Sequence, residues 1–197
     1  MANTPIPLPD ADVALDPAWL PMAEADALFV ALHACIPWTV HRVRLFGREV
    51  ESPRLSCWIG DPDAVYRYSG MRHAPHPWPA TLQPLRERLQ RETGARFNSV
   101  LANLYRDGRD AMGWHSDDEP ELGAAPVIAS VSLGAPRRFV LKHRALPAHK
   151  LGIVLPHGSL LLMRGEMQRH YRHALPRTAK PVAARINLTF RRIQPIG

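Results

Sequence analysis

The sequence predicts a mainly β fold with flanking helices (α+β), in which a double-stranded β barrel follows two helices. Three observations predict it. Two segments before residue 95 carry apolar residues at helical spacing, six short segments after Gly94 alternate with a period of two, and glycines and prolines separate those six segments. Short period-two strands at this spacing are typical of a sandwich or barrel and not of alternating βαβ units.

The composition is that of one globular domain. The chain has 197 residues, 46% of them hydrophobic and 22% charged, which is ordinary for a domain of this size. We expect a single domain over residues 21–197. Residues 1–20 are rich in proline and acidic residues, and we expect a flexible or loosely docked leader there.

The excess of basic residues favours a polyanionic partner such as nucleic acid. Lys and Arg number 25 against 18 Asp and Glu, and attraction to phosphate supplies most non-specific nucleic-acid affinity. Two cysteines are too few for a disulfide framework or a cysteine zinc site. No segment approaches the ~18 apolar residues of a membrane span, and the N-terminus has no signal-peptide pattern. We therefore expect a cytoplasmic monomer without a membrane partner.

Two helices are expected before the barrel. The first, over residues 22–36, follows Pro21 and is stopped by Pro37. Its apolar stripe comprises Met22, Leu28, Phe29 and Leu32. The second, over residues 81–94, ends at Gly94, a residue type that favours helix C-termini. Its stripe comprises Leu82, Leu85 and Leu89.

The barrel is expected over about residues 95–192. Its period-two segments are FNSVLANLY, PVIASVSLG, RRFVLKH, GIVLP, GSLLLMRG and ARINLTFRR. In the last segment one face would pack in the core with Ile186, Leu188 and Phe190. The other face carries Arg185, Asn187, Thr189 and Arg191. That polar face could lie in water at a sheet edge, or line a cavity that binds a carboxylate, because guanidinium groups bind carboxylates bidentately.

Two further polar residues repeat this pattern. Asn103 and Tyr105 share a face of FNSVLANLY. They are candidates to complete an anion pocket with the two arginines, and the alternative is that each is a satisfied buried polar group.

The stretch GWHSDDE is a candidate metal site. On a strand, His115 and Asp117 point to the same side. One imidazole and one carboxylate are two thirds of the 2-His-1-carboxylate triad that holds ferrous iron. A solvated acidic turn is the alternative. The third ligand would be His170 or His173, and the spacing does not choose between them.

Four motifs occur in order within residues 37–192: NLYRDGRDAMGWHSDDEPEL, IASVSLGAPRRFVLKHR, LPHGSLLLMRGEMQRHYRHALP and RINLTFR. They resemble the AlkB family of iron(II)- and 2-oxoglutarate-dependent dioxygenases, which reverse alkylation damage in nucleic acids. Two more segments, LFGREVESPRLSCWIGD and YRYSGMRHAPHPWP, resemble the duplex-repair branch of that family. The resemblance implies a double-stranded β-helix (jelly-roll, cupin-like) barrel with a nucleotide-recognition lid over about residues 38–80.

The resemblance also implies site residues. The iron ligands would be His115, Asp117 and, from its H-A-L-P context, His173. The 2-oxoglutarate pocket would comprise Asn103, Tyr105, Arg185, Asn187, Thr189 and Arg191. Substrate-binding positions would be Arg54, Tyr66, Tyr68, Ser69, Asp118 and Glu119. Leu45 and Phe46 would form a wedge that fills the gap left by a flipped base, with ordinary core packing as the alternative. No separate acid or base residue is implied.

The implied activity is oxidative demethylation of bases such as 1-methyladenine and 3-methylcytosine in DNA, with RNA as a further substrate class. It would use Fe(II), 2-oxoglutarate and O2 and release succinate, CO2 and formaldehyde. A base in a duplex must be flipped out before it can react. Candidate phosphate contacts are Arg106, Arg109, Arg137, Arg138 and Arg169. The chain departs from the duplex-repair branch at Cys57, Trp58, His76, Pro77 and Pro79, which lie in the segment that selects the substrate.

Three alternatives stay open on the sequence alone. A related hydroxylase or demethylase could act on protein, or the fold could be kept as a nucleic-acid-binding module without catalysis. A zinc hydrolase could use the same three ligands, but it would have no need of two inward-facing arginines.

Overall fold

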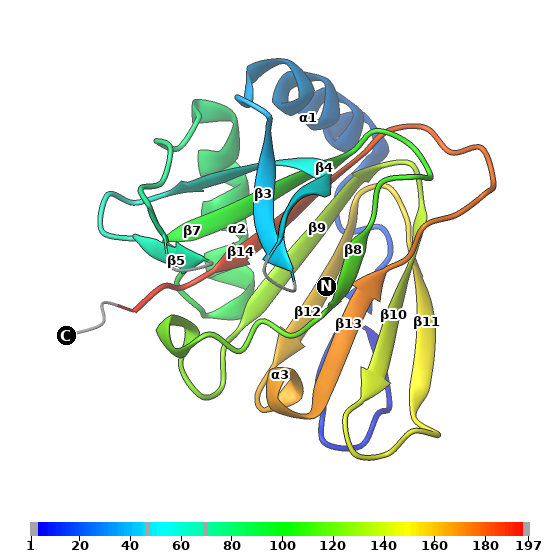
Figure 1. Cartoon of the computed structure of the whole chain (residues 1–197). Helices are drawn as coiled ribbons and strands as arrows, with labels where there is room; N and C mark the ends of the chain where they lie inside the picture. The colour runs from blue at the N-terminus through cyan, green and yellow to red at the C-terminus, as the bar shows by residue number, and fades with distance from the viewer. Residues whose placement is uncertain (1–3, 46–47, 69–70, 195–197) are drawn as a thin grey trace.

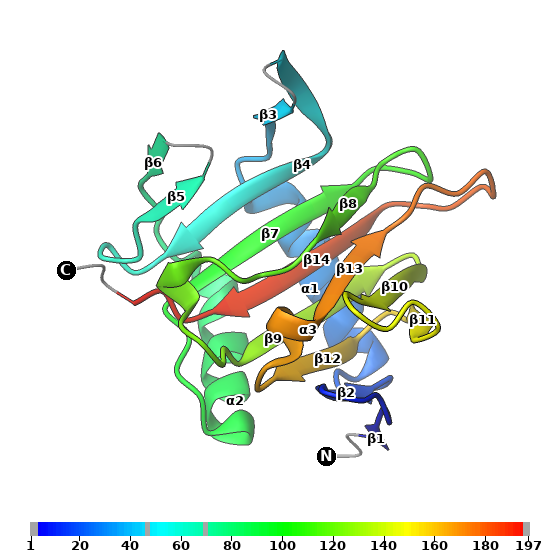
Figure 2. The ribbon, with the colours of Figure 1, turned by 60° about the horizontal axis from the view of Figure 1, so that its bottom comes forward.

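The computed structural model describes residues 4–45, 48–68 and 71–194, with the side chains of 42–45, 48–49, 66–68 and 71–73 left out of the description. Over these residues the strands form a sheet of eight strands, a sheet of four strands and a small hairpin. Figures 1 and 2 show the two larger sheets as the walls of one barrel-like body. The expected mainly β fold is confirmed.

The larger sheet carries one wall of the site. In sheet order its strands are β1 (Thr4–Pro5), β2 (Asp12–Asp16), β12 (Ser159–Arg164), β9 (Ile128–Gly134), β14 (Arg185–Arg191), β7 (Ser99–Tyr105), β4 (Arg48–Gly60) and β3 (Thr39–Leu45). All neighbouring strands are antiparallel. The polar last strand therefore lies in the middle of the sheet and not at an edge.

The smaller sheet carries the other wall. Its strands, in order, are β11 (Lys150–Leu155), β10 (Arg137–His143), β13 (Tyr171–Leu175) and β8 (Met112–His115). The small hairpin consists of β5 (Tyr66–Tyr68) and β6 (Met71–His73). The period-two pattern did not single out β8 and β13 as strands, because both are short and neither MGWH nor YRHAL gives a clear alternation of polar and apolar residues.

Helices α1 (Met22–Cys35) and α2 (Gln83–Thr93) agree with the sequence, and both lie on the side of the larger sheet away from the smaller one (Figure 2). Ile36 is extended, as expected for a residue before proline. Gly94 ends α2 with a left-handed φ of 70°. Met22 is 65% exposed, so its expected place in the buried stripe is wrong. The shorter helices are η1 (Ala80–Leu82), η2 (Pro120–Leu122) and α3 (Met167–His170).

The expected leader is wrong for its described part. Strand β2 pairs with β12 along five residues, and Val13, Ala14, Trp19 and Leu20 are buried. The physical reason is that β12 would otherwise be an open edge, whose unpaired backbone groups a neighbouring strand can satisfy. Among the described residues no helix is both long and apolar enough to cross a membrane.

The two larger clusters of core residues hold the sheets in place. One cluster lies between the helices and the larger sheet and includes Leu32, Leu89 and Leu188. The other lies between the two sheets at one end of the barrel and includes Leu141 and Met163. The rest of the space between the sheets is lined by the polar face of β14, and this is where the site lies.

Candidate metal and co-substrate site

Three predicted ligands meet where strands β8 and β13 of the smaller sheet pair. His115 ends β8 and lies opposite His173 of β13, with ring centroids 4.2 Å apart. Asp117 follows two residues later, and one ligand atom from each residue lies within 4.8 Å of the others. Ligand atoms held by one metal ion at about 2.1 Å lie roughly 3 Å apart or slightly more, so a small rotation of these side chains suffices.

The protonation states of the two histidines suit a metal. His115 Nδ1 lies 2.8 Å from the carbonyl oxygen of Gly113. A carbonyl only accepts, so Nδ1 carries a proton, and Nε2 lies 3.9 Å from Asp117 Oδ1 on the side where a metal would bind. Burial, together with the nearby His115, lowers the pKa of His173 to about 3. His173 is therefore neutral near pH 7, and its ring can bind a metal.

Asp117 is held as a carboxylate. Burial alone would raise its pKa, but the charge of Arg191 and its hydrogen bond hold the pKa of Asp117 below its usual value. Arg191 donates to Asp117 Oδ1 at 2.8 Å, and the backbone N–H of Asp117 donates to Gln168 at 3.0 Å. Two imidazoles and a fixed carboxylate are the donor set of a 2-His-1-carboxylate iron centre, so the residues fit that metal.

A cavity extends from these ligands along the larger sheet. All six residues predicted for the co-substrate pocket line it: Asn103, Tyr105, Arg185, Asn187, Thr189 and Arg191. Apolar side chains close the remaining wall, and they are Met112, Phe139, Leu155, Met163 and Leu175. The polar face of the last strand therefore lines a cavity and does not face water.

Arg185 has no carboxylate partner among the described residues. Its side chain is fully buried. It donates to Ser132 Oγ at 2.8 Å, and its Nε has no hydrogen-bond partner within the described part of the chain. Burial lowers the pKa of Arg185 to about 10, which leaves it charged at neutral pH. A buried charge without a counter-ion is costly, so the cavity is suited to a carboxylate ligand.

Sequence reasoning missed three polar residues that support the site. Ser132 accepts from Arg185, Ser130 accepts from Asn187 at 2.8 Å, and Gln168 accepts from Asp117. The two serines alternate in ASVSLG, so the period-two pattern contained a signal for them. Gln168 lies on α3 and had no such signal.

The residues predicted to bind the substrate lie in different environments. Arg54 donates to Asn103 Oδ1 at 2.7 Å and to Ser52, which joins β4 to the cavity wall. Asp118 is half exposed and pairs with Arg144, and Glu119 is partly buried. Phe46 and Ser69 lie outside the described residues, and so do the side chains of Leu45, Tyr66 and Tyr68.

His170, the other candidate for the third ligand, belongs to a different cluster. His170 stacks on His143 at 5.8 Å, and together with Asp10 they form a second group of potential ligands. His143 Nδ1 accepts two backbone N–H groups, from Ala145 and Leu146. Its Nε2 therefore carries the proton, which opposes metal binding at this cluster.

The arginines proposed for phosphate contacts divide into three kinds. Arg106, Arg109 and Arg169 pair with Asp110, Asp107 and Glu166. Arg138 is exposed on β10. Arg137 is 4% exposed, so its place among the phosphate contacts is corrected: it points into the protein because carbonyl groups of two loops solvate its guanidinium.

Comparison with known proteins agrees with this geometry. Residues 12–191 match the sequence family described as the 2OG-Fe(II) oxygenase superfamily. The chain belongs to this superfamily. Within it the chain is 40% identical to the human DNA oxidative demethylase ALKBH2, over 87% of the chain and 69% of that protein, which places it in the AlkB family.

Other members of the AlkB family show similar identity. DNA oxidative demethylase ALKBH2 of Bos taurus is 42% identical over 88% of this chain, and alpha-ketoglutarate-dependent dioxygenase alkB homolog 3 of Bos taurus is 38% identical over 93%. The chain spans 66% of the length of each of these two proteins. The solved structure of OsALKBH1 superposes with a TM-score of 0.64 at 15% identity, over 95% of this chain and 98% of that one. That likeness shows the shared jelly-roll fold.

Proposed function

We propose that this AlkB-family oxygenase uses Fe(II), 2-oxoglutarate and O2 to demethylate N-alkylated bases in DNA. The main support is one cavity that holds both the His115–Asp117–His173 cluster and Arg185, a buried cation that has no carboxylate partner among the described residues. A metal site beside an anion site suits a metal that is chelated by a dicarboxylate. The relatives named as DNA oxidative demethylases support DNA as the substrate.

Each residue has a defined task in this proposal. Bound together, iron(II) and 2-oxoglutarate supply the oxidising chemistry that removes an N-methyl group with O2. His115, Asp117 and His173 would hold the metal from one side, and Arg185 would bind the far carboxylate of the co-substrate. The apolar wall around Phe139 would exclude water from the reacting atoms. No residue need act as a separate acid or base.

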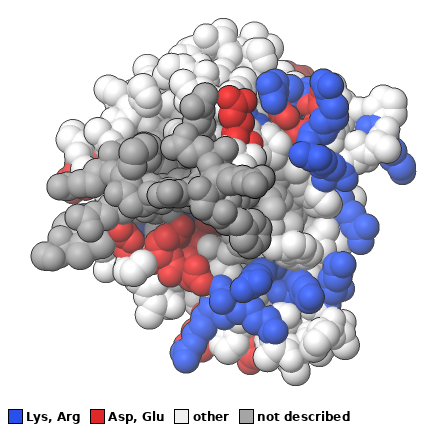
Figure 3. All heavy atoms as spheres, viewed as in Figure 1, with Lys and Arg blue, Asp and Glu red and all other residues white. Residues whose placement is uncertain are grey.

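An exposed basic surface supports a nucleic-acid partner. Arg138 and Lys142 of β10, Lys150 of β11 and Arg172 of β13 point outward from the smaller sheet, and the four strands of that sheet contain no Asp or Glu. In Figure 3 Lys and Arg gather over the region where Figure 1 draws β10, β11 and β13. We name these four residues the basic face. Phosphate attraction to such a face strengthens binding without reading sequence.

An exposed aromatic residue adjoins the basic face. Trp114 is 47% exposed on β8, and Lys150 Nζ lies 5.9 Å from its ring. An aromatic ring beside basic side chains is the arrangement on which unpaired bases stack. This juxtaposition favours a substrate with at least one unpaired base.

Methyl removal from an oligonucleotide is the direct test. We expect the wild type, with iron(II), ascorbate and 2-oxoglutarate, to release formaldehyde from strands that carry 1-methyladenine or 3-methylcytosine. Asp117→Ala should abolish release, because it removes the carboxylate of the cluster. Full activity of Asp117→Ala would overturn the ligand set, and 2-oxoglutarate consumption on a protein but on no nucleic acid would favour a protein hydroxylase.

The finer features of the proposal are RNA as a further substrate, a monomeric state and a cytoplasmic location. The free thiols of Cys35 and Cys57 are consistent with a reducing compartment. A panel of DNA and RNA strands at fixed salt, together with light scattering of the purified protein, tests the first two features.

A further inference from the structure

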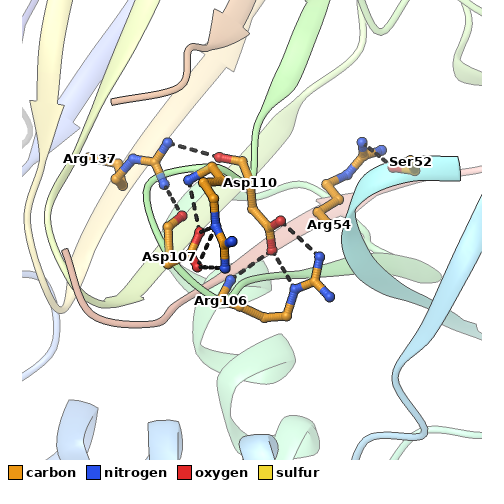
Figure 4. A network of polar contacts seen from close by, with 7 residues as sticks. Ser52, Arg54, Arg106, Asp107, Asp110 and Arg137 are labelled. Carbon is orange, nitrogen blue, oxygen red and sulfur yellow. Dashed lines mark hydrogen bonds and ion pairs between the residues drawn. The ribbon is translucent and has the colours of Figure 1, made fainter. Parts of the chain in front are cut away.

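A single buried guanidinium ties together two of the connections that cross between the two larger sheets, residues 106–111 and 176–184. Arg137, the first residue of β10, donates to the carbonyl oxygens of Asp107 at 3.1 Å, Asp110 at 3.0 Å and Pro176 at 2.8 Å. Figure 4 shows its fork reaching the first two of these residues. Three carbonyl acceptors satisfy an Arg fork in a way that a lysine ammonium does not reproduce.

The two connections lead from one half of the site to the other. Residues 106–111 join β7, which carries Tyr105, to β8, which ends at His115. Residues 176–184 join β13, which carries His173, to β14, which begins at Arg185. Each connection therefore runs between a strand with a candidate metal ligand and a strand with a residue of the co-substrate pocket.

These connections also pack closely on each other. Thr178 N donates to Gly108 O at 2.9 Å, and a Cβ added at Gly108 would lie 2.4 Å from Thr178 O. Within the first connection, Arg106 pairs with Asp110 through two nitrogens (Figure 4). We call the contact between residues 106–111 and 176–184 the joint. It leaves no room at Gly108 for even one methyl group.

Arg137 also borders the anion pocket. Its guanidinium lies 5.9 Å from the ring of Tyr105, and the guanidinium of Arg185 lies 5.3 Å from the same ring. Its hydrogen-bond acceptors are neutral carbonyls, so its charge is not cancelled by a direct carboxylate partner among the described residues. Two cations therefore lie near the Tyr105 ring at the Arg185 end of the cavity.

We infer that Arg137 is a positioning residue for the co-substrate: it fixes the joint between the two crossing connections and so holds Tyr105 and Arg185 at the spacing that binds the far carboxylate of 2-oxoglutarate. This inference rests on the proposed function. Arg137 acts through Tyr105 and Arg185 and does not line the cavity itself.

The test compares a buried arginine with an exposed one. Arg137→Lys keeps the charge but loses the fork, and Arg91→Lys is the matched change at an exposed position of α2. Calorimetric titration of 2-oxoglutarate into Mn(II)-loaded protein measures the effect without turnover. We expect Arg137→Lys to weaken 2-oxoglutarate binding about tenfold or more, as the loss of charged hydrogen bonds implies. Mn(II) affinity should change less than about twofold, and Arg91→Lys should match the wild type.

A second variant covers the case in which Arg137→Lys does not fold. Gly108→Ala forces the same joint apart from its other side and leaves every arginine in place, so it should weaken 2-oxoglutarate binding likewise. Equal binding by the wild type, Arg137→Lys and Gly108→Ala would overturn the inference. Parallel losses of Mn(II) and 2-oxoglutarate affinity would also overturn it, since they would indicate general disruption. Failure of the wild type to bind 2-oxoglutarate would instead sink the proposed function, and the inference with it.

Discussion

Arg191 and Asp117 form a buried ion pair at 2.8 Å that connects the last strand of the larger sheet to the loop after β8. Both side chains are at most 5% exposed. Asp117 is at the same time a candidate metal ligand, so one carboxylate lies between a fixed arginine and the position of the metal. The metal half and the co-substrate half of the site are therefore coupled directly.

Removal of Arg191 should destabilise the metal-free protein. Arg191→Gln leaves the Asp117 carboxylate buried without its closest cation, and breaking a buried pair costs about 3 kcal/mol or more. Urea unfolding of EDTA-treated protein measures this cost. Arg192→Gln, a change at the next and exposed residue, should stay close to the wild type. Equal stability of the two variants would contradict the role given to the pair.

Two neighbouring histidines should behave differently toward iron. His173→Ala removes a member of the cluster with His115 and Asp117, so bound iron per chain and formaldehyde release should fall to background. His170 lies in the cluster with His143 and Asp10, so His170→Ala should keep most of both. Metal analysis of the two variants after anaerobic loading gives the comparison. Loss of iron in the His170 variant with retention in the His173 variant would reverse the assignment.

The two cysteines should differ in reactivity and in their effect on stability at high pH. Burial raises the pKa of Cys57 from 9.0 to about 11, whereas Cys35 is exposed. Iodoacetamide at a pH of about 8 should modify Cys35 and spare Cys57, because the thiolate is the reactive form. Mass spectrometry of peptides resolves the two sites.

The same shift has a definite sign for folding. The pKa of Cys57 is higher in the folded state, so its contribution to stability is complete below pH 9.0 and is lost as the pH rises toward about 11. The slope in that range is at most about 1.4 kcal/mol per pH unit. Cys57→Ala should remove this part of the pH dependence. An unchanged slope in that variant would count against the burial effect.

The basic face should set the salt dependence of DNA binding. Replacing Lys142, Lys150 and Arg172 together with glutamine should lower the slope of log affinity against log salt by up to about 0.9 for each phosphate that is no longer neutralised. A matched control replaces Arg91, Arg96 and Arg192, which line a cleft beside the end of α2. Fluorescence anisotropy over a salt series measures both. A larger change in the control would place the nucleic acid on the other surface.

Much of the site could be predicted because strand periodicity is a local property. The alternation in RINLTFR assigns Arg185, Asn187, Thr189 and Arg191 to one face whatever surrounds the strand, and the same argument pairs Asn103 with Tyr105. The His-x-Asp spacing places two donors on one side. These relations depend only on backbone geometry between near neighbours in the chain.

The environment of that face could not be predicted in the same way. A polar strand face has the same sequence pattern at a solvated sheet edge and inside a cavity. Only the pairing of β14 between β7 and β9 excludes an edge position. Arg137 has the sequence context of a surface cation, yet carbonyls from two distant loops surround it. The first twenty residues show no periodic pattern, so the sequence could not predict β2. Its five residues form a strand because they pair with β12.

The sequence by itself determined which side chains share a face, how the helices begin and end, and which donors lie near one another along the chain. The tertiary structure alone decided that Asp117 meets an arginine 74 residues away and that Arg185 is left without a carboxylate partner among the described residues. The physical reason is the range of the interactions. Periodicity and capping act over a few residues, whereas burial and ion pairing depend on segments that only the packed sheets bring together.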